Sequence, residues 1–453
     1  MRLALGELPT PRRLAALLRA DSLIRNSVYI MAVTIITSGL GFVFWLVAAR
    51  RFDAAQVGLA AALVSAMTLV SLLSNLGINT ALVQMLPRRS AGREWSATLT
   101  AGMLLGVVSS GLFGLLTALV LPLLSSRFRL LDSSLGYLLM FVAGVALTTA
   151  TNLLDYACIA ERKAEKTLIR NTVFSVVKIP VLVLPFVVAM GTFGIFFSWA
   201  AATAVTVLVG AAMIPGLGRG YRLAATGVRG ELRRLRSYIA GHHSINIGNF
   251  GPWWLMPVFV TVQVSATATA YFYATWRICG LLYMISPSVA SSLAAEGAHS
   301  PAELWRIAGR SQRTIMAVLI PACILFAAAG HWILLAFGSA YAAQGFVLLL
   351  MFTVGSLPDS ILDVWVGVLR VEGRLRFGAW LQLGTAAIAL VIAWFLLPPM
   401  GIAGAGVGWL ISRAVGVVLV WWDYRRQQGR RGATLKPTLP LDAERLAAET
   451  ITP

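Results

Sequence analysis

Three basic residues stand deep inside long apolar stretches of the sequence. Lys178, Arg277 and Arg413 lie about 8 to 11 residues into such a stretch, a depth of roughly 12–17 Å if the stretch is helical. A charge at the bilayer centre costs roughly 2.5–3.5 kcal/mol on insertion scales, so it usually faces protein or a water-filled cavity. The three residues are therefore candidates for a cationic cavity that holds an anionic substrate. The alternatives are snorkelling to the membrane edge and an ion pair within a helix bundle.

Three acidic residues stand near the ends of two further apolar stretches. Asp359 and Asp363 are four residues apart and so share a helix face, and Asp155 has a similar place in the first half of the chain. These carboxylates could bind a coupling ion, H⁺ or Na⁺. The alternative, which we favour, is pairing at the membrane edge with one of three nearby basic residues: Arg162, Arg370 and Arg374.

Polar residues recur at helical spacing on two apolar stretches. One stripe follows i, i+4, i+7, i+11 spacing, and a similar stripe lies near the start of the chain. Such stripes fit either a wet cavity or hydrogen bonds between helices. Four of these residues are predicted to contact substrate: His242, Asn246, Asn249 and Asn75. The other stripe members are Trp253, Thr68, Ser71 and Asn79.

The elements that position these residues are membrane-spanning helices. The chain is 58% hydrophobic and only 12% charged, whereas a soluble domain carries roughly 25% charged residues. Apolar stretches of about 20 residues, each long enough to cross a bilayer, recur along nearly the whole chain. The three cysteines, Cys158, Cys279 and Cys323, fall inside these stretches without disulfide or metal-ligand spacing, which indicates a packing role.

We predict an all-α integral membrane protein of about twelve spans. Residues 1–26 form a basic amphipathic segment, 27–214 a first lobe of six helices, 215–237 a basic linker, 238–422 a second lobe, and 423–453 a polar tail. The expected spans are 28–49, 59–83, 96–121, 135–159, 171–189, 194–214, 238–263, 269–292, 314–337, 343–369, 377–397 and 402–422.

The distribution of basic residues sets the orientation. The net charge is +19, and with the N-terminus in the cytoplasm the tails and even-numbered turns hold 30 of the 37 Lys and Arg, against four on the opposite side. This bias predicts a multi-pass protein of the cell (inner) membrane with both termini in the cytoplasm. The basic residues then face anionic membrane lipids, and nucleic acid is not expected as a partner.

The two halves of the sequence resemble each other. Residues 190–207 and 400–417 share seven identities at a constant offset of 210, including Gly191 with Gly401 and Trp199 with Trp409. A second similarity between the two halves relates Asp155 to Asp363. Since each half holds an even number of spans, the halves should be related by a pseudo-two-fold axis along the membrane normal, with a substrate path between them. This arrangement favours a transporter.

Several motifs resemble the polysaccharide flippases, of the O-antigen or Wzx type, in the multidrug/oligosaccharidyl-lipid/polysaccharide (MOP) exporter superfamily. In chain order they are residues 39–50 (GLGFVFWLVAAR), 55–58 (AQVG), 73–78 (LSNLGI), 336–341 (AFGSAY), 373–376 (GRLR) and 397–405 (LPPMGIAGA).

The resemblance implies two six-helix lobes arranged as a V that opens alternately to each side of the membrane. It implies export of a polyprenyl-diphosphate-linked oligosaccharide from the cytoplasmic to the outer leaflet for cell-surface polysaccharide synthesis. The substrate's negative charges agree with the deep basic residues.

Two other classes of function compete with this interpretation. An ion-coupled multidrug exporter of the same superfamily would favour an acidic or aromatic cavity for organic cations. An integral glycosyltransferase or polymerase usually has a sizeable segment outside the membrane. No Walker A sequence, metal-spaced histidines or nucleophile elbow is present, so we predict no catalytic residue, no metal and no cofactor.

Overall fold

The computed structural model describes residues 22–217, 220–222, 230–231, 243–287, 289–290, 293 and 303–434. Within these residues the chain is almost entirely helical and contains no strand, so the predicted all-α membrane fold is confirmed. The first 21 residues, most of the predicted linker and the chain from residue 435 onward lie outside the described part.

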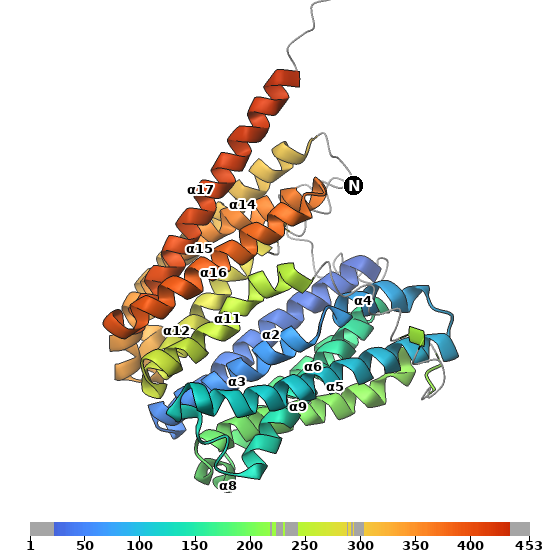
Figure 1. The fold of residues 1–453 in the computed structure, drawn as a ribbon, viewed down its shortest axis with the longest axis vertical. Coiled ribbons are helices and arrows are strands. Elements are labelled where there is room, and N and C mark those ends of the chain that lie inside the picture. Colours follow the sequence, from blue (N-terminus) through green and yellow to red (C-terminus); the bar gives the residue numbers. More distant parts are fainter. Residues whose placement is uncertain are drawn as a thin grey trace, which may run out of the picture.

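The helices form two neighbouring groups (Figure 1), which we call the first and second lobes. The first lobe contains α2 (Ser22–Arg51), α3 (Ala54–Ser74), α4 (Ile78–Met85), α5 (Arg93–Leu124), α6 (Leu135–Ala160), α7 (Ala164–Leu182), α8 (Pro185–Ala189) and α9 (Thr192–Met213). The second lobe contains α11 (His243–Gln263), α12 (Ala266–Tyr283), α14 (Leu304–Phe337), α15 (Ser339–Val371), α16 (Leu375–Met400) and α17 (Ala403–Thr434).

Nine helices of the described chain are long and apolar enough to cross a membrane. Helices α7, α11 and α12 occupy the positions of predicted spans five, seven and eight, and they carry Lys178, the polar stripe and Arg277. Because of their polar side chains, these three helices are not among the nine that are apolar enough. With them, the described helices match the twelve predicted spans.

Two predicted spans of the first lobe are interrupted in the structure. Span two, expected as one helix over 59–83, breaks between α3 and α4 because Leu76 and Gly77 both adopt positive φ angles, 52° and 82°. Asn75 stands at the break, and its side-chain oxygen accepts a hydrogen bond from the Asn79 backbone N–H at 3.1 Å. Span five, expected over 171–189, breaks between α7 and α8 just after Pro180. Irregular backbone at membrane depth is tolerated where it is buried in protein or lines a cavity.

The repeated glycines of the two halves have the same structural role. Gly191 precedes α9 with φ 57°, and Gly401 precedes α17 with φ 60°. Three residues later, Gly194 and Gly404 each lie directly against the backbone of the preceding helix. A β-carbon would stand 1.8 Å from the Val187 carbonyl oxygen in the first case and 2.4 Å from the Leu396 carbonyl oxygen in the second. The internal repeat therefore extends from sequence to backbone geometry.

The lobes meet along α2 and α3 of the first lobe and α11 and α12 of the second. The approach is closest at Gly58 of α3, where a β-carbon would stand 1.7 Å from the Ala266 carbonyl oxygen at the start of α12. Only a glycine leaves room for this contact.

Two arginines of the first lobe cap helix ends of the second lobe. Arg50, near the end of α2, donates from Nε to the Ala336 carbonyl oxygen of α14 at 2.7 Å. Arg127, between α5 and α6, donates from Nη2 to the Val264 carbonyl oxygen at 2.7 Å, just after the end of α11, and also reaches the Thr261 and Val262 carbonyls. A cation at a helix C-terminus satisfies orphan carbonyls and complements the helix dipole. Together with Gly58, these contacts close the two lobes onto each other at one end of the bundle.

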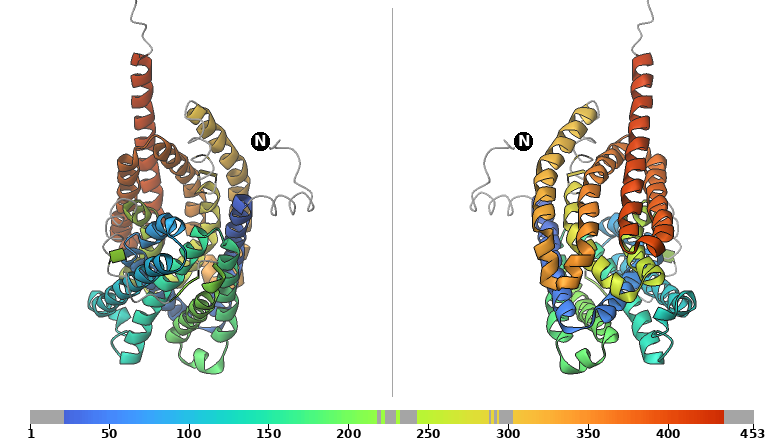
Figure 2. Two further views of the ribbon diagram at one scale, coloured as in Figure 1. Left: turned by 90° about the vertical axis from the view of Figure 1, so that its right-hand side faces the viewer. Right: turned by 90° about the vertical axis from the view of Figure 1, so that its left-hand side faces the viewer.

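Helix α17 continues to Thr434, into the predicted polar tail, and projects beyond the other helices (Figure 2). Arg425 and Arg426 stack over Trp421 and Trp422, four residues earlier, with 4.5 and 5.3 Å between cation and ring centre. These i, i+4 contacts stabilise α17 where it leaves the apolar region.

Candidate functional site

A cavity of about 390 Å³ lies between the lobes, with walls from α2 on one side and α11, α12 and α15 on the other. Its wall is largely aromatic, and its ionisable side chains include Arg277, Asp359 and Asp363. The aromatic residues are Phe42, Trp45, Phe250, Trp253, Trp254, Tyr273, Trp276, Tyr283 and Phe337. We call this space the central cavity.

Arg277 is the basic residue of the central cavity wall. It sits on α12 and reaches toward the first lobe, where its Nη2 atom lies 3.6 Å from the position that a β-carbon on Gly41 of α2 would occupy. Within the described residues, no hydrogen bond or ion pair reaches its guanidinium. The structure therefore places a guanidinium that is unpaired within the described chain at the lobe interface.

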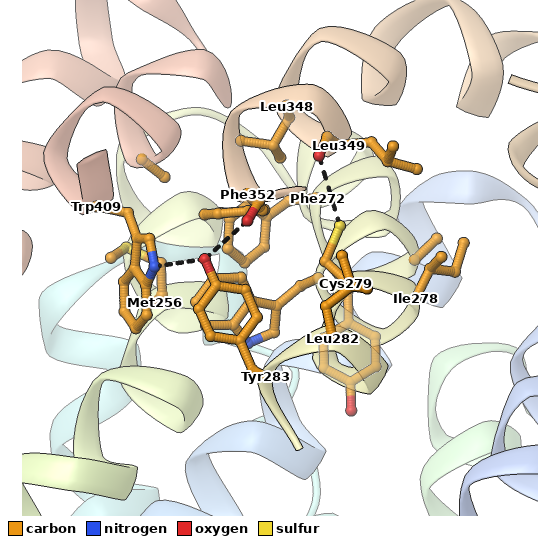
Figure 3. Packing of buried hydrophobic residues seen from close by; sticks show 14 of the residues in the cluster. Met256, Phe272, Ile278, Cys279, Leu282, Tyr283, Leu348, Leu349, Phe352 and Trp409 are labelled. Carbon is orange, nitrogen blue, oxygen red and sulfur yellow. Dashed lines mark hydrogen bonds between the residues drawn. The ribbon is translucent and has the colours of Figure 1, made fainter. Parts of the chain in front are cut away.

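An aromatic cluster that includes Tyr283 of the cavity wall fixes α12 (Figure 3). The Tyr283 hydroxyl donates to the Phe352 carbonyl oxygen at 2.9 Å and lies 2.8 Å from Nε1 of Trp409, which donates to it. Cys279, also on α12, points at the Leu349 carbonyl oxygen. These bonds join α12 to α15 and α17, so the helix that carries Arg277 is held on its second-lobe side.

Arg413 does not line the central cavity. Its Nη1 atom forms an ion pair with Oδ1 of Asp359 at 2.9 Å, and its guanidinium stacks on Trp409 at 4.2 Å from the ring centre. Of the alternatives stated for this arginine, the structure contains the ion pair. The partner is a residue that we predicted to bind a coupling ion, so two expected sites form one neutral pair on the cavity wall.

Asp363 lines the same wall one helical turn from Asp359. The Ser286 hydroxyl donates to its Oδ2 atom at 2.5 Å, and no basic side chain of the described chain is paired with it. The favoured alternative, pairing with Arg370 or Arg374, is therefore not what the structure contains. Arg374 instead pairs with Asp423 of α17, at 2.6 Å.

Lys178 is buried within the first lobe, 2% exposed. Its Nζ atom lies 4.5 Å from the ring centres of Phe174 and Trp199 and 5.2 Å from that of Phe44. Trp199 is the repeat partner of Trp409, so each lobe holds one cation on the equivalent tryptophan. Lys178 stands behind the cavity wall.

Asp155 forms a buried ion pair in the first lobe. Arg170 donates to its Oδ1 atom at 2.5 Å and to the Thr151 hydroxyl at 2.9 Å, and Asn171 donates to Oδ2 at 3.1 Å. Our expected partner, Arg162, was wrong. Arg170 and Asp155 lie about equally far from the turn that joins α6 to α7, so the sequence contained a signal for this pair.

A second cavity of about 160 Å³ adjoins the first, because Phe250 and Trp254 line both. Its remaining wall is polar and carries no carboxylate, ammonium or guanidinium group. We call it the amide pocket, and its other lining residues are Thr68, Ser71, Leu72, Asn75, Asn79, Asn152 and Tyr156. The stripe predicted on span two, including Asn75, thus faces a cavity, although the helix that carries it is broken. Asn152 and Tyr156 of α6 were not predicted.

The stripe predicted on span seven is described only in part. His242 lies outside the described residues, and Asn246 and Asn249 lie on α11 but their side chains are not among the described ones. Trp253, the last member, lines the central cavity. Among the described residues, no group of three His, Cys, Asp or Glu side chains comes together in a way that could hold a metal ion.

Comparison with known proteins finds one family match, in the first half of the chain. Residues 23–233 match the family model described as polysaccharide biosynthesis protein. The resemblance to polysaccharide flippases of the MOP superfamily is thereby confirmed. No curated protein matches the sequence.

Solved structures of MOP transporters share the fold of this protein. It is similar to the lipid II flippase MurJ in an inward closed conformation, with a TM-score of 0.72, 11% identity, and coverage of 88% of this chain and 87% of that one. It is also similar to an inward-facing multidrug resistance MATE family transporter, with a TM-score of 0.66, 14% identity, and coverage of 90% and 96%. A MOP superfamily transporter from Pyrococcus furiosus matches with a TM-score of 0.61, 13% identity, and coverage of 93% and 98%. These neighbours are transporters and flippases, and at this identity they define the fold alone.

Proposed function

We propose that the protein is an alternating-access flippase that moves a polyprenyl-diphosphate-linked oligosaccharide from the cytoplasmic to the outer leaflet. The observation that carries the proposal is the Arg277 guanidinium on the wall of a cavity between the lobes, unpaired within the described part of the chain. A diphosphate carries negative charge, and the planar fork of an arginine binds phosphate oxygens in a bidentate manner. The family match of residues 23–233 and the shared fold support the same class of function.

The proposed orientation follows the distribution of basic residues. With both termini in the cytoplasm, the end of the bundle closed by Arg50, Arg127 and Gly58 faces outward. The substrate then enters from the cytoplasmic side, with the anionic head between the lobes and the lipid tail in the bilayer. Lys178 and Arg413 lie behind the cavity wall, where each contacts aromatic rings of its own lobe. We therefore assign the primary phosphate contact to Arg277.

A coupling ion, H⁺ or Na⁺, stays part of the proposal. Of the three carboxylates considered for it, Asp155 and Asp359 form ion pairs. Asp363 lines the cavity and has no paired cation within the described chain, so it is the best placed of the three. Anionic lipids remain the predicted partners of the basic cytoplasmic turns.

One feature favours a second candidate function, export of an organic cation. The central cavity has nine aromatic residues and two carboxylates on its wall, and aromatic faces attract cations. The ion pair between Arg413 and Asp359 neutralises one of these carboxylates. Within the described residues, Arg277 and Asp363 then provide one positive and one negative charge on the cavity wall. The two candidates therefore differ in which of these two residues meets the substrate.

The test is transport by the purified protein in liposomes, comparing a polyprenyl-diphosphate-linked sugar with an organic cation such as ethidium. We expect the Arg277→Ala variant to lose most of its glycolipid translocation, and Arg277→Lys to lose less, since a lysine keeps the charge but not the bidentate geometry. Arg306→Ala is the matched control, because the Arg306 side chain on α14 is 75% exposed. Ethidium export that depends on Asp363 and is unaffected by Arg277→Ala would establish the second candidate instead.

A further inference from the structure

The amide pocket offers hydrogen-bonding groups that the protein itself leaves unused. Asn75 is 5% exposed; its side-chain oxygen is occupied by the Asn79 backbone, whereas its NH₂ group has no partner in the described part of the chain. The carboxamide of Asn152 is likewise without a hydrogen bond to any described residue. Within the described residues, the Asn75 NH₂ group and the whole Asn152 carboxamide are therefore available to a ligand as two donor groups and one acceptor.

The other polar residues of the pocket are already engaged. The Ser71 hydroxyl lies 2.8 Å from the Thr149 hydroxyl, and the Thr68 hydroxyl donates to the Val64 carbonyl oxygen at 2.8 Å. If the stripe existed only to join helices, Asn75 and Asn152 would be engaged in the same way, because an unsatisfied buried polar group is costly. Their free groups distinguish a binding surface from a packing contact.

The backbone beside the pocket is also held in an unusual state. Leu76 has a φ of 52°, which a residue with a β-carbon rarely adopts and which costs on the order of 1–3 kcal/mol. This strained break separates Asn75 at the end of α3 from Asn79 in α4. Both side chains face the pocket because of it, although one continuous helix was expected.

The pocket also presents aromatic faces and excludes charge. Trp254, Phe250 and Tyr156 contribute to its wall, and none of its lining residues carries a charge. An anionic group would enter without a counter-charge, which is unfavourable. A sugar ring fits this wall, since its hydroxyls suit carboxamides and its apolar face suits an aromatic ring. The volume of about 160 Å³ suits one ring-sized group.

We propose that the amide pocket binds one uncharged sugar ring of the transported substrate, while Arg277 holds the diphosphate in the adjoining central cavity. This inference rests on the proposed function. The two cavities meet at Phe250 and Trp254, so a single molecule can occupy both. The substrate class is thereby narrowed to lipid diphosphates whose glycan carries at least one uncharged sugar within reach of the phosphate.

The test is binding to the full-length protein in detergent micelles, measured by calorimetry with two kinds of probe. One is farnesyl diphosphate. The other is farnesyl diphosphate linked to glucose, galactose or N-acetylglucosamine. We expect the wild type to bind at least one glycosylated probe more tightly than the sugar-free probe, and Asn152→Leu to reduce that advantage by about five- to tenfold. The affinity for farnesyl diphosphate should not change.

A matched control lies one turn away on α6. Thr148 lines neither cavity, and its hydroxyl has no hydrogen-bond partner in the described chain, so Thr148→Val should leave both affinities unchanged. Arg277→Ala should weaken the binding of both kinds of probe. If Asn152→Leu weakens both kinds equally or leaves the sugar-dependent advantage intact, the amide pocket is not a sugar site, and the same holds if no sugar adds affinity in the wild type. A wild type that binds none of the probes would overturn the proposed function itself, and this inference with it.

Discussion

At the scale of single residues, depth in the sequence predicted burial well but did not predict partners. Arg277, Arg413 and Lys178 all lie within the protein, yet one is unpaired at a cavity, one is in an ion pair and one is surrounded by aromatic rings. The difference depends on the rotation of each helix about its axis and on which helix lies opposite. Asp359 stands 54 positions before Arg413, and nothing local in the sequence joins them.

The Arg413–Asp359 pair allows a prediction about stability. Arg413→Ala should lower the free energy of unfolding by about 3 kcal/mol, because it leaves a mostly buried carboxylate without its counter-charge. The double variant Arg413→Met/Asp359→Leu should recover most of this loss, since two apolar side chains of similar size need no partner. Thermal unfolding of both variants in detergent, with Asp359→Leu alone completing the cycle, measures the coupling. Equal unfolding temperatures for wild type and Arg413→Ala would show that the pair is structurally neutral.

At the scale of elements, the apolar stretches predicted the helices, whereas the breaks within them escaped prediction. The hydrophobicity of the residues around Leu76 predicts one continuous span. Hydrophobicity indicates burial in the membrane and carries no information about backbone angles. Asn75 and Gly77 were local signals for a break, since both residue types favour turns. The repeat was visible in the sequence because its glycines are required by backbone contacts that no other residue permits.

That requirement predicts opposite effects for two glycines of the second lobe. Gly404→Ala should destabilise the protein by about 1–3 kcal/mol, because the new methyl group must push α17 away from the Leu396 carbonyl. Gly384→Ala, in α16, should be neutral or stabilising by up to about 1 kcal/mol, since nothing lies within 4 Å of its β-carbon position and alanine favours helix. Unfolding temperatures and expression levels of the two variants compare them directly. A Gly404→Ala variant as stable as the wild type would mean that the two helices separate without cost.

At the scale of the whole molecule, the charge distribution and the repeat predicted a two-lobed membrane transporter fold. The contacts between the lobes could not be predicted, because they join residues more than 100 positions apart through backbone carbonyls that have no sequence signature. Arg50 and Arg127 are two of the four basic residues that the charge bias assigns to the non-cytoplasmic side. In the structure each caps a helix of the opposite lobe.

In the proposed orientation, we expect the loss of these caps to favour the outward-open state. In a variant with Cys158, Cys279 and Cys323 replaced by alanine, a cysteine introduced at Ala274, on the cavity wall, reports access from outside the cell. Arg50→Ala/Arg127→Ala should raise its labelling by a membrane-impermeant maleimide several-fold, because charged hydrogen bonds of about 1.5–3 kcal/mol each are removed. Arg129→Ala, an exposed residue on the same turn as Arg127, is the control. Unchanged labelling in the double variant would show that Gly58 and its surroundings hold the closed end without the arginines.

In the proposed orientation, the caps at Arg50 and Arg127 face the cell exterior. Their acceptors are peptide carbonyls, which neither gain nor lose a proton in any physiological medium. Acidification of the surroundings therefore leaves this closure intact, whereas a closure made of carboxylates would weaken as the pH fell. If transport responds to external acid, the response must arise farther inside, at a carboxylate that protons reach only after the lobes have parted. In that case the proton would act as a transported ion and would not trigger the opening of the outer end.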